Sequence, residues 1–488
     1  MKITRVVCCS LILFSSIGIA WANPVPFLNQ PEPTSVTPGR AAFTLKLIGA
    51  NFVEGAVVNW NGSPRSTTVV SADVIEAAIE AADVATAGTA TVTVVNPTPG
   101  GGTSNVVYVT VRDPSPSVSF TTANEVAPEP SLSTTTLGDF NNDGKVDVVV
   151  AQIIPQHEIK IQLFLGHGDG TFQSPITSTS PIPIEDQDLQ MVSAQTADFN
   201  GDGKLDLVLG LHSCNEVGVV LLNNGDGTFT EKSDLPIFPF PHGIQTPFAI
   251  GDFNGDGNLD LVYVAGYSSN FYLTTFLGNG DGTFTSFSGL HMVDCCAPPV
   301  AADFNGDGKL DLAVANGVNK LNIFLGKGDG SFRFLTQLTP EMGAPNSSAL
   351  SVLAGDLNGS GRLDLVTGGR GSNESGALSV FLGNGNGAFT GDGGMISSDF
   401  GFVDIFGFAD LNGDGKLDIL ADGIVSTTNS STFATSVLLG NGNATFQDSI
   451  VDASPLAPFY GVADFNGDGK LDLLGVNLTN GIISVALQ

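Results

Sequence analysis

The chain has 488 residues, 42% of them hydrophobic, which is long enough and apolar enough for more than one globular unit. Only 14% of the residues are charged, and 49 Asp and Glu stand against 18 Lys and Arg, giving a formal net charge of −31. This charge argues against nucleic acid and anionic membrane surfaces as partners. Metal sites or a merely solvated acidic surface are the two explanations left for the excess of carboxylates.

Residues 1–22 have the pattern of a secretory signal peptide. Two basic residues precede an apolar stretch from Val6 to Ala20, and the Ala-Trp-Ala sequence that ends at Ala22 fits a cleavage site. An uncleaved anchor is the alternative, although the apolar stretch is short for a membrane span. We expect an exported protein, secreted or at a cell surface, with no membrane insertion after cleavage.

Residues 23–112 carry short Val- and Thr-rich runs separated by turn signals, a pattern typical of a small β-sandwich. The expected strands are 45–48, 57–60, 90–95 and 106–111. The motifs LIGANF from Leu47, VNWNG from Val58 and VVNP from Val94 resemble the IPT/TIG domain, an immunoglobulin-like module. The resemblance implies a spacer or interaction module, followed by a proline-containing linker at 113–117.

Residues 118–488 repeat a nine-residue loop whose commonest form is DFNGDGKLD. Its copies start 51 to 59 residues apart, a period typical of repeat architectures. We number the loops 1 to 7 in chain order; they start at Asp139, Asp198, Asp252, Asp303, Asp356, Asp410 and Asp464. Side chains that carry oxygen stand at positions 1, 3, 5 and 9, and Gly at position 6 permits a sharp turn.

This donor set predicts a calcium site in each loop, because Ca²⁺ takes six to eight oxygen ligands whereas zinc prefers Cys and His. Position 7 would contribute its backbone carbonyl, so its side chain can vary. An EF-hand is excluded, because no Glu stands at position 12 and the flanking runs are strand-like. The alternative that Asp and Asn only build tight turns is weakened by the seven copies.

A second motif, FLGNGDGTF at Phe276, recurs about 25 residues after loops 1 to 6 and is typical of a β-hairpin. Each repeat then supplies four strands: A before the loop, B after it, C before the hairpin and D after it. This predicts an all-β fold, a seven-bladed β-propeller of four-stranded blades after the immunoglobulin-like sandwich. The last repeat lacks strand D, and we expect residues 118–121 to supply it and close the ring.

The repeats resemble the FG-GAP/VCBS family, which includes the integrin α-subunit propellers, over residues 118–488. The resemblance implies calcium ligands at positions 1, 3, 5, 7 and 9, up to seven ions in all. The loop at Asp356 is expected to bind most weakly, because Ser360 replaces an Asp. The predicted metal ligands are Asp139, Asn141, Asp143, Lys145, Asp147, Asp198, Asn200, Asp202, Lys204, Asp206, Asp252, Asn254, Asp256, Asn258, Asp260, Asp303, Asn305, Asp307, Lys309, Asp311, Asp356, Asn358, Ser360, Arg362, Asp364, Asp410, Asn412, Asp414, Lys416, Asp418, Asp464, Asn466, Asp468, Lys470 and Asp472.

The B–C and D–A connections share the opposite face and vary most between repeats. They hold most histidines and all the cysteines of the mature chain: His157, His212, His242, His291, Cys214, Cys295 and Cys296. The sequence is compatible both with one disulfide from Cys214 to Cys295 or Cys296 and with three free thiols. By analogy with integrins, this variable face is where a ligand is expected.

We expect a binding or adhesion protein for an extracellular protein or glycan. A structural surface protein without a specific ligand and a polysaccharide-active enzyme of the lyase type are the alternatives. The histidines lie in different repeats and form no acid–base constellation, so we predict no catalytic residues and no cofactor besides Ca²⁺. The aromatic cluster of Tyr263, Tyr267 and Tyr272 is the one place suited to stacking a sugar.

Overall fold

The computed structural model describes residues 22–126, 133–154, 158–181, 190–212, 216–236, 244–245, 247–267, 270–292, 297–316, 319–340, 348–370, 376–397, 403–426, 431–447, 450–452, 459–477 and 482–488. Apart from the single 3-10 turn Ala81–Val84, every element in these ranges is a β-strand. The predicted all-β class is therefore confirmed. None of the described helices is long and apolar enough to cross a membrane.

The N-terminal region forms two sheets around one core, which is the architecture of a small sandwich. One sheet has the order β1 (Phe27–Glu32), β3 (Phe43–Ala50), β7 (Val74–Ile79) and β6 (Thr67–Val69). The other has the order β2 (Ser35–Val36), β10 (Val107–Val111), β8 (Gly88–Asn96), β4 (Val57–Trp60) and β5 (Ser63–Pro64), and β9 (Gly102–Thr103) pairs with β8.

Alternate residues of the sandwich strands point into the shared core, as the pleat of a β-strand requires. In β8 every second residue from Ala90 to Asn96 is buried, and Trp60 at the end of β4 is 1% exposed in the same core. The predicted strand at 57–60 is β4, and the other three predictions fall on β3, β8 and β10.

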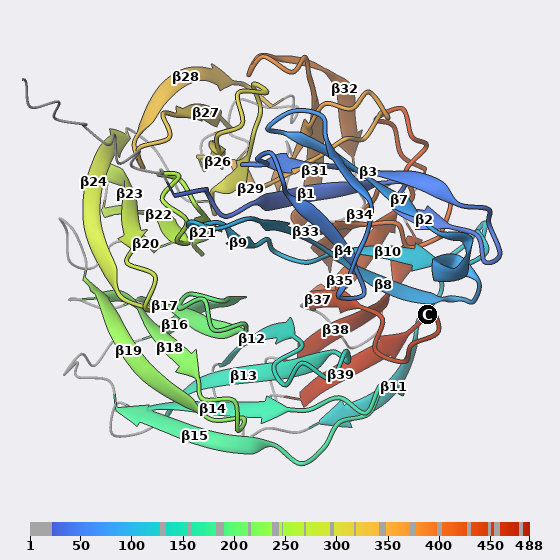
Figure 1. The fold of residues 1–488 in the computed structure, drawn as a ribbon, viewed down its shortest axis with the longest axis horizontal. Coiled ribbons are helices and arrows are strands. Elements are labelled where there is room, and N and C mark those ends of the chain that lie inside the picture. The colour runs from blue at the N-terminus through green and yellow to red at the C-terminus, as the bar shows by residue number, and fades with distance from the viewer. Residues whose placement is uncertain are drawn as a thin grey trace, which may run out of the picture.

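The described residues beyond the sandwich form seven further sheets, each built from strands A to D (Figure 1). We call these sheets blades 1 to 7 in chain order. Blade 1 has β12 (Ser133–Gly138), β13 (Asp147–Ile154), β14 (Glu158–Phe164) and β15 (Ile176–Pro181); blade 2 has β16 (Gln190–Ala197), β17 (Asp206–His212), β18 (Glu216–Asn223) and β19 (Phe229–Pro236); and blade 3 has β20 (Ile244–Gln245) with β21 (Ala249–Gly251), β22 (Asp260–Tyr267), β23 (Asn270–Gly278) and β24 (Phe284–Met292). Blade 4 has β25 (Val300–Ala302), β26 (Asp311–Ala315), β27 (Leu321–Gly326) and β28 (Phe332–Leu338); blade 5 has β29 (Ser348–Gly355), β30 (Asp364–Arg370), β31 (Gly376–Gly383) and β32 (Phe389–Ser397); blade 6 has β33 (Val403–Ala409), β34 (Asp418–Ser426), β35 (Ser431–Leu438) and β36 (Ile450–Asp452); and blade 7 has β37 (Phe459–Ala463), β38 (Asp472–Asn477), β39 (Ile482–Leu487) and β11 (Thr121–Val126).

The last sheet closes the ring with a strand from the start of the repeat region. β11 pairs antiparallel with β39, and Thr121 lies opposite Leu487. The chain just before the first strand A therefore supplies the missing strand D, as predicted, but the strand is Thr121–Val126, and of the predicted residues 118–121 only Thr121 belongs to it. Val118 is 5% exposed and packs with Leu411 and Leu473, so it serves as a core residue ahead of the strand.

Neighbouring blades are joined by pairs of phenylalanines from the two repeated motifs. The Phe at loop position 2 packs edge-to-face on the Phe that starts strand D of the next blade, as for Phe140 and Phe229, with ring centroids 5.9 Å apart. The same contact recurs between Phe199 and Phe284, Phe253 and Phe332, and Phe304 and Phe389. The motif phenylalanines are therefore core residues, as the sequence predicted.

The sandwich lies across one end of the propeller, over the centre of the ring (Figure 1). This end carries the seven nine-residue loops, and we call it the loop face. Two backbone hydrogen bonds join this N-terminal region to the loops. The N–H of Asn51 in the sandwich donates to the carbonyl of Gly308 in loop 4, and the N–H of Ser115 in the linker donates to the carbonyl of Asn412 in loop 6. The sandwich and propeller thus form one continuous structure through contacts at the loops.

Candidate calcium loops and the surfaces around them

The Asp at position 9 ties each loop to the end of strand C. In loop 1, Asp147 is fully buried, and its two oxygens accept hydrogen bonds from the N–H groups of Phe140 (2.9 Å) and Gly166 (2.8 Å). The same two bonds occur in every loop, including the last, where Asp472 accepts from Phe465 and Gln488. Because a carboxylate offers about four acceptor positions, each of these Asp residues keeps capacity for another partner.

Alternate side chains at positions 1, 3 and 5 turn back onto the loop itself. In loop 1, Asp139 accepts hydrogen bonds from the N–H groups of Asp143 (3.0 Å) and Gly144 (2.7 Å). Asn141 also accepts from the N–H of Asp143, and Asp143 in turn accepts from the N–H of Lys145. Gly144, at position 6, has a φ of 81°, a conformation that favours glycine. The predicted spacing therefore curls three oxygen-bearing side chains around one short segment.

The loops concentrate negative charge where water is scarce. Burial raises the pKa of the position-9 carboxyls above the usual value for Asp, and the carboxylate at position 1, with that at position 5 in every loop but loop 5, adds to this effect. The pKa rises to about 6 for Asp147, Asp206, Asp364 and Asp472, to about 7 for Asp418, and to about 8 for Asp260 and Asp311. A bound cation would offset this charge.

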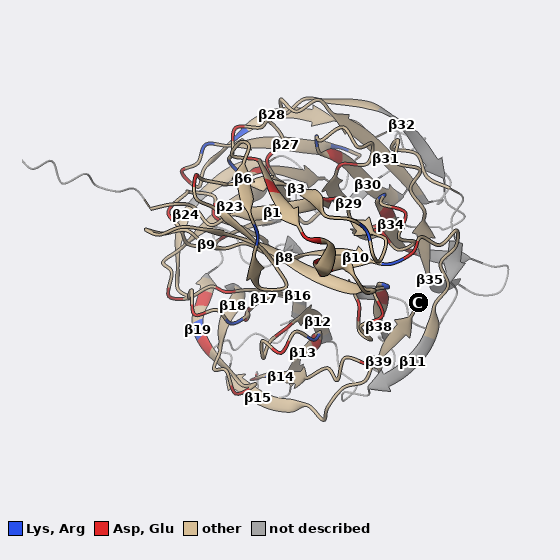
Figure 2. Ribbon diagram, turned by 45° about the vertical axis from the view of Figure 1, so that its right-hand side comes forward, with Lys and Arg blue, Asp and Glu red and all other residues tan. Residues whose placement is uncertain are grey.

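Positive side chains of the loops contribute little compensation. Lys204 and Lys416, both at position 7, reach the position-5 carboxylates of their own loops at 2.7 and 3.0 Å. These side chains are about one-third or more exposed, and ion pairs of this kind contribute little to stability. Figure 2 shows acidic residues recurring around the ring, with few basic residues among them.

Within the described ranges, no three His, Cys, Asp or Glu side chains converge as a ready-made metal cluster. A cluster of that kind contains only His, Cys, Asp or Glu, whereas the predicted calcium ligands also include Asn side chains and backbone carbonyls. The donors fit calcium in kind, because the buried carboxylates are hard oxygen ligands with spare acceptor positions and uncompensated charge. The residues that would hold the ion are those at positions 1, 3, 5, 7 and 9.

Loop 5, in which Ser360 stands at position 5, lies beside charged residues of the sandwich. Glu32 accepts a hydrogen bond from Lys46 at 2.8 Å, and its other carboxylate oxygen is buried without a hydrogen-bond partner. Burial and the neighbouring Asp356 raise the pKa of Glu32, whereas Lys46 opposes the rise. Glu32 and Asp356 are more than 300 residues apart, so no local sequence pattern predicts that they lie close together.

The sandwich also donates hydrogen bonds to the position-1 Asp of three loops. The backbone N–H of Val25 lies 2.8 Å from Asp252 Oδ2, the hydroxyl of Thr34 lies 3.0 Å from Asp410 Oδ2, and that of Thr89 lies 2.8 Å from Asp464 Oδ2. No local pattern in the sequence could have identified these residues, because the partners are 227 to 376 positions apart.

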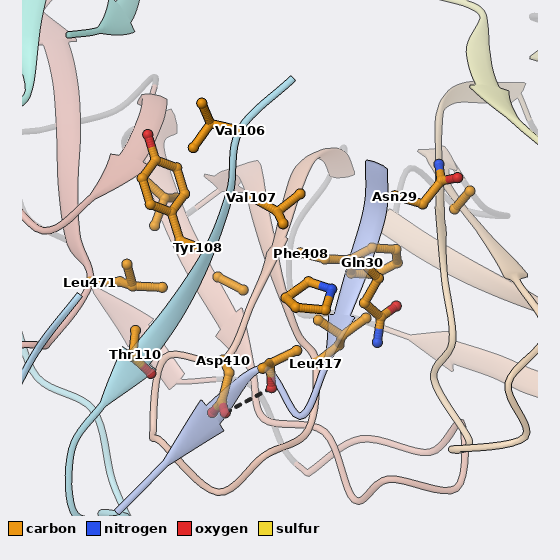
Figure 3. Close-up of a pocket in the computed structure, with 15 residues that line it drawn as sticks. Asn29, Gln30, Val106, Val107, Tyr108, Thr110, Phe408, Asp410, Leu417 and Leu471 are labelled. Carbon is orange, nitrogen blue, oxygen red and sulfur yellow. Dashed lines mark hydrogen bonds between the residues drawn. The ribbon is translucent and has the colours of Figure 1, made fainter. Parts of the chain in front are cut away.

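Two cavities lie between the sandwich and the ring. One, of about 230 Å³, is lined by Tyr108 and Thr110 from β10 and by Asp410 and Phe408 from the propeller (Figure 3). The other, of about 450 Å³, is lined by residues of β1 and by strand A residues such as Gln195 and Val300. Charged side chains are scarce in both, with Asp410 the one acidic residue among the lining residues of the described chain.

The variable face is described only in part. His157, His242, Cys214, Cys295 and Cys296 lie outside the described residues. His212 ends β17, and His291 in β24 packs edge-to-face on Tyr272 with centroids 5.2 Å apart. The residues therefore give no described cluster that could act on a substrate.

The prediction that the cluster of Tyr263, Tyr267 and Tyr272 can stack a sugar is wrong for Tyr263. Tyr263 is fully buried in the interior of the propeller and stacks on Phe276 with ring centroids 5.5 Å apart. Both faces of β22 are covered by neighbouring blades, with Leu261 and Tyr263 in one core cluster and Val262 and Val264 in another. Tyr272 is half-buried and stays a candidate for contact with a ligand.

The loops and the ring of four-stranded sheets define a propeller with repeated acidic loops. A family model described as FG-GAP-like repeat matches residues 139–209, 198–263, 252–314, 303–367 and 356–421, together more than half of the chain. The chain belongs to this family, as its loop motifs predicted. The matched residues do not reach the sandwich, so its resemblance to IPT/TIG domains stays a prediction.

Curated relatives share part of this sequence. Cartilage acidic protein 1 from Mus musculus and from Homo sapiens is 32% identical over 152 residues, which cover 29% of this chain and 22% of the relative. The protein of the same name from Xenopus tropicalis is 29% identical over 179 residues, covering 34% and 27%. The match therefore spans about a quarter of the length of these relatives.

Solved structures resemble the chain at a lower level. A six-bladed propeller lectin from Aleuria aurantia has a TM-score of 0.37 and 10% identity, covering 67% of this chain and 96% of the lectin. The NanB sialidase from Streptococcus pneumoniae has a TM-score of 0.40 and 11% identity, covering 85% and 74%. Scores this low carry no argument about function.

Proposed function

We propose that this protein is an exported calcium-binding propeller that acts as a binding or adhesion module for an extracellular protein or glycan. The observation that carries the proposal is the position of the sandwich on the loop face. Because the chain itself occupies that face, the opposite face, where the B–C and D–A connections lie, is the broad end of the ring available to a partner.

Calcium has a structural role in this proposal. When bound, the ion would supply the positive charge that the loops lack. Position-9 residues such as Asp147 then hold the loop against strand C through their hydrogen bonds to Phe140 and Gly166. A loop fixed in this way holds the start of strand B and the neighbouring phenylalanine pair in place. Calcium would thus support the variable face indirectly, by making the scaffold rigid.

Export is supported by two features. The residues before Asn23 have the signal-peptide pattern, and the relatives' name connects them with cartilage, a tissue rich in extracellular matrix. The low number of basic residues and the net charge of −31 favour a protein or neutral glycan over a polyanion as the partner.

The test is binding of the mature chain, residues 23–488, to an array of glycans and extracellular proteins in calcium and in EDTA. The proposal predicts at least one saturable partner whose binding falls in EDTA. A substitution on the variable face, Tyr272→Ala, should weaken binding if the partner contacts blade three, whereas Phe287→Ala, at an exposed position on β24, is the matched control. Absence of any partner under both conditions would overturn the proposal in favour of a purely structural protein.

A further inference from the structure

The sandwich covers five of the seven loops. It contacts backbone or side-chain atoms of loops 3 to 7. In loops 1 and 2, by contrast, Asp139 and Asp198 accept hydrogen bonds only from their own loops within the described part of the chain. The propeller therefore carries two classes of loop, covered and uncovered, with the same motif in each.

In three covered loops the contact falls on a predicted calcium ligand. Asp252, Asp410 and Asp464 each use Oδ2 to accept a hydrogen bond from the sandwich in addition to one from position 6 of the loop. The donors are the N–H of Val25 and the hydroxyls of Thr34 and Thr89. Figure 3 shows the bond on Asp410 as a dashed line beside the cavity.

Two of the three carboxylates on which these contacts fall are deeply buried. Asp252 is 2% exposed and Asp410 is 3% exposed, whereas Asp464 is half-buried, as are Asp139 and Asp198 in the uncovered loops. Burying a carboxylate without a counter-ion is costly, and hydrogen bonds alone offset only part of the cost. Docking of the sandwich on empty loops is thus opposed by a charge penalty that a bound cation removes.

The sandwich also brings basic residues to this surface, Lys46 beside loop 5 and Arg112 beside loop 6. Arg112 is 6% exposed, and its guanidinium donates to the carbonyl of Leu411 in loop 6 and to the side chain of Gln488. Loop 6 has three carboxylates and Lys416, so one Ca²⁺ would neutralise the loop, and the Arg112 guanidinium donates to neutral oxygens instead of competing for the carboxylates. The cation of the sandwich and the calcium ion are therefore compatible in the same loop.

We propose that Thr34, Thr89 and the N–H of Val25 are outer positioning groups of calcium loops 6, 7 and 3, so that calcium binding and docking of the sandwich strengthen each other. The inference rests on the calcium sites proposed above. Each sandwich donor fixes Oδ2 of the position-1 Asp, while Oδ1 is held by backbone N–H groups of the loop itself. Hydrogen bonds of this kind to a ligand typically change metal affinity 10- to 100-fold. Reciprocity requires that calcium tighten docking by the same factor.

Amide hydrogen exchange on the full mature chain measures docking directly. The N–H groups of Val25 and Asn51 are bonded across the interface, to Asp252 and to Gly308. The N–H of Val94 is bonded to Ser104 inside the sandwich, so it reports whether the sandwich stays folded. We expect replacement of calcium by EDTA to speed exchange at Val25 and Asn51 by about tenfold or more, with Val94 unchanged.

The matching variant is T34V/T89V, which removes the two hydroxyls with little change in shape, and Thr37→Val at an exposed position is its control. In a calcium titration, the double variant should bind two ions about tenfold more weakly than the wild type. Asp198→Asn, in an uncovered loop, should remove one ion without changing exchange at Val25.

Two outcomes separate this inference from the proposed function. If calcium binds but exchange at Val25 and Asn51 is equally slow in EDTA, and T34V/T89V binds calcium like the wild type, the coupling is wrong and the calcium loops stand. If the wild-type chain binds no calcium in the titration, both the loops and the coupling are wrong.

Discussion

Phe465 in the last loop packs edge-to-face on Phe172 in the first repeat, with ring centroids 6.0 Å apart. The N–H of Gly170, in the same hairpin as Phe172, donates to the carbonyl of Phe465 at 2.9 Å. These contacts repeat, across the closure, the joint that links Phe140 to Phe229 between the first two blades. The ends of the repeat region are thus held together by side chains as well as by the pairing of β11 with β39.

Phe465→Ala should destabilise the propeller through this joint. Phe465 is 3% exposed, and removing a buried ring of this size costs about 3 kcal/mol in the free energy of unfolding. Denaturant unfolding followed by fluorescence or circular dichroism measures the change. Phe287→Ala removes a ring that is 45% exposed and should change the same free energy by less than about 0.5 kcal/mol. Equal effects of the two substitutions would contradict the role assigned to the joint.

Asp418→Asn tests the position-9 residue that ties loop to blade. Its two carboxylate oxygens accept hydrogen bonds from Leu411 at 2.9 Å and Gly440 at 2.8 Å, whereas Asn can accept only one of them and turns its NH₂ group toward the other donor. We expect a loss of about 2 kcal/mol in calcium buffer, together with the loss of one bound ion. Asp113→Asn, at an exposed position in the linker, is the control, and an effect no larger than that of the control would count against the assignment.

Ser360→Asp should strengthen the weakest predicted site. It restores at position 5 of loop 5 the carboxylate found in the other six loops. Because affinity in loops of oxygen ligands increases with ligand charge, binding of the last ion should tighten on the order of tenfold. Calorimetric titration with calcium measures the change, and Ser360→Ala controls for loss of the hydroxyl. An unchanged weakest site would show that position 5 does not face the ion.

Acid should weaken the sandwich through the pair of Arg65 and Asp83. The Arg65 guanidinium donates two hydrogen bonds to Asp83 and holds the pKa of that carboxyl below its usual value. A lowered folded pKa stabilises the protein above the unfolded pKa of about 3.9, and this stability is lost as pH falls through the folded pKa.

Arg65→Ala should therefore lower stability by about 1 kcal/mol at pH 7, with the difference shrinking as the pH falls through the lowered folded pKa of Asp83. The melting temperatures of wild type and variant between pH 7 and pH 3 provide the comparison. A difference that stays constant across this range would show that Arg65 acts through packing and not through its charge.

The parts of the fold that could be predicted from sequence are those that depend on short, local residue patterns. The spacing of loop and hairpin motifs predicts where strands A to D lie. The last repeat lacks a strand D of its own, which points to the segment before the first strand A, where β11 pairs with β39. Its start was misplaced by three residues because Val118 has the apolar character of a strand but packs in the core. Tyr263 was misjudged because both faces of β22 pack against neighbouring blades, so its side chain is buried whichever face it points to.

The placement of the sandwich could not be predicted. It depends on contacts such as Thr34 with Asp410 and Thr89 with Asp464, each between residues more than 370 positions apart. A lone Thr in a turn or strand carries no sign of such a partner. The loop motif predicts which oxygens would hold a cation, but the outer groups that orient them come from surface complementarity between two separately folded units.

The most direct test of the account is a calcium titration of the mature chain, residues 23–488, after its bound metal has been removed with EDTA. The account predicts uptake of up to seven ions per chain, the ion at the Asp356 loop being the weakest, and a large rise in melting temperature as they bind. A chain that takes up no calcium, or melts at the same temperature with and without it, would contradict the claim that these loops are calcium sites.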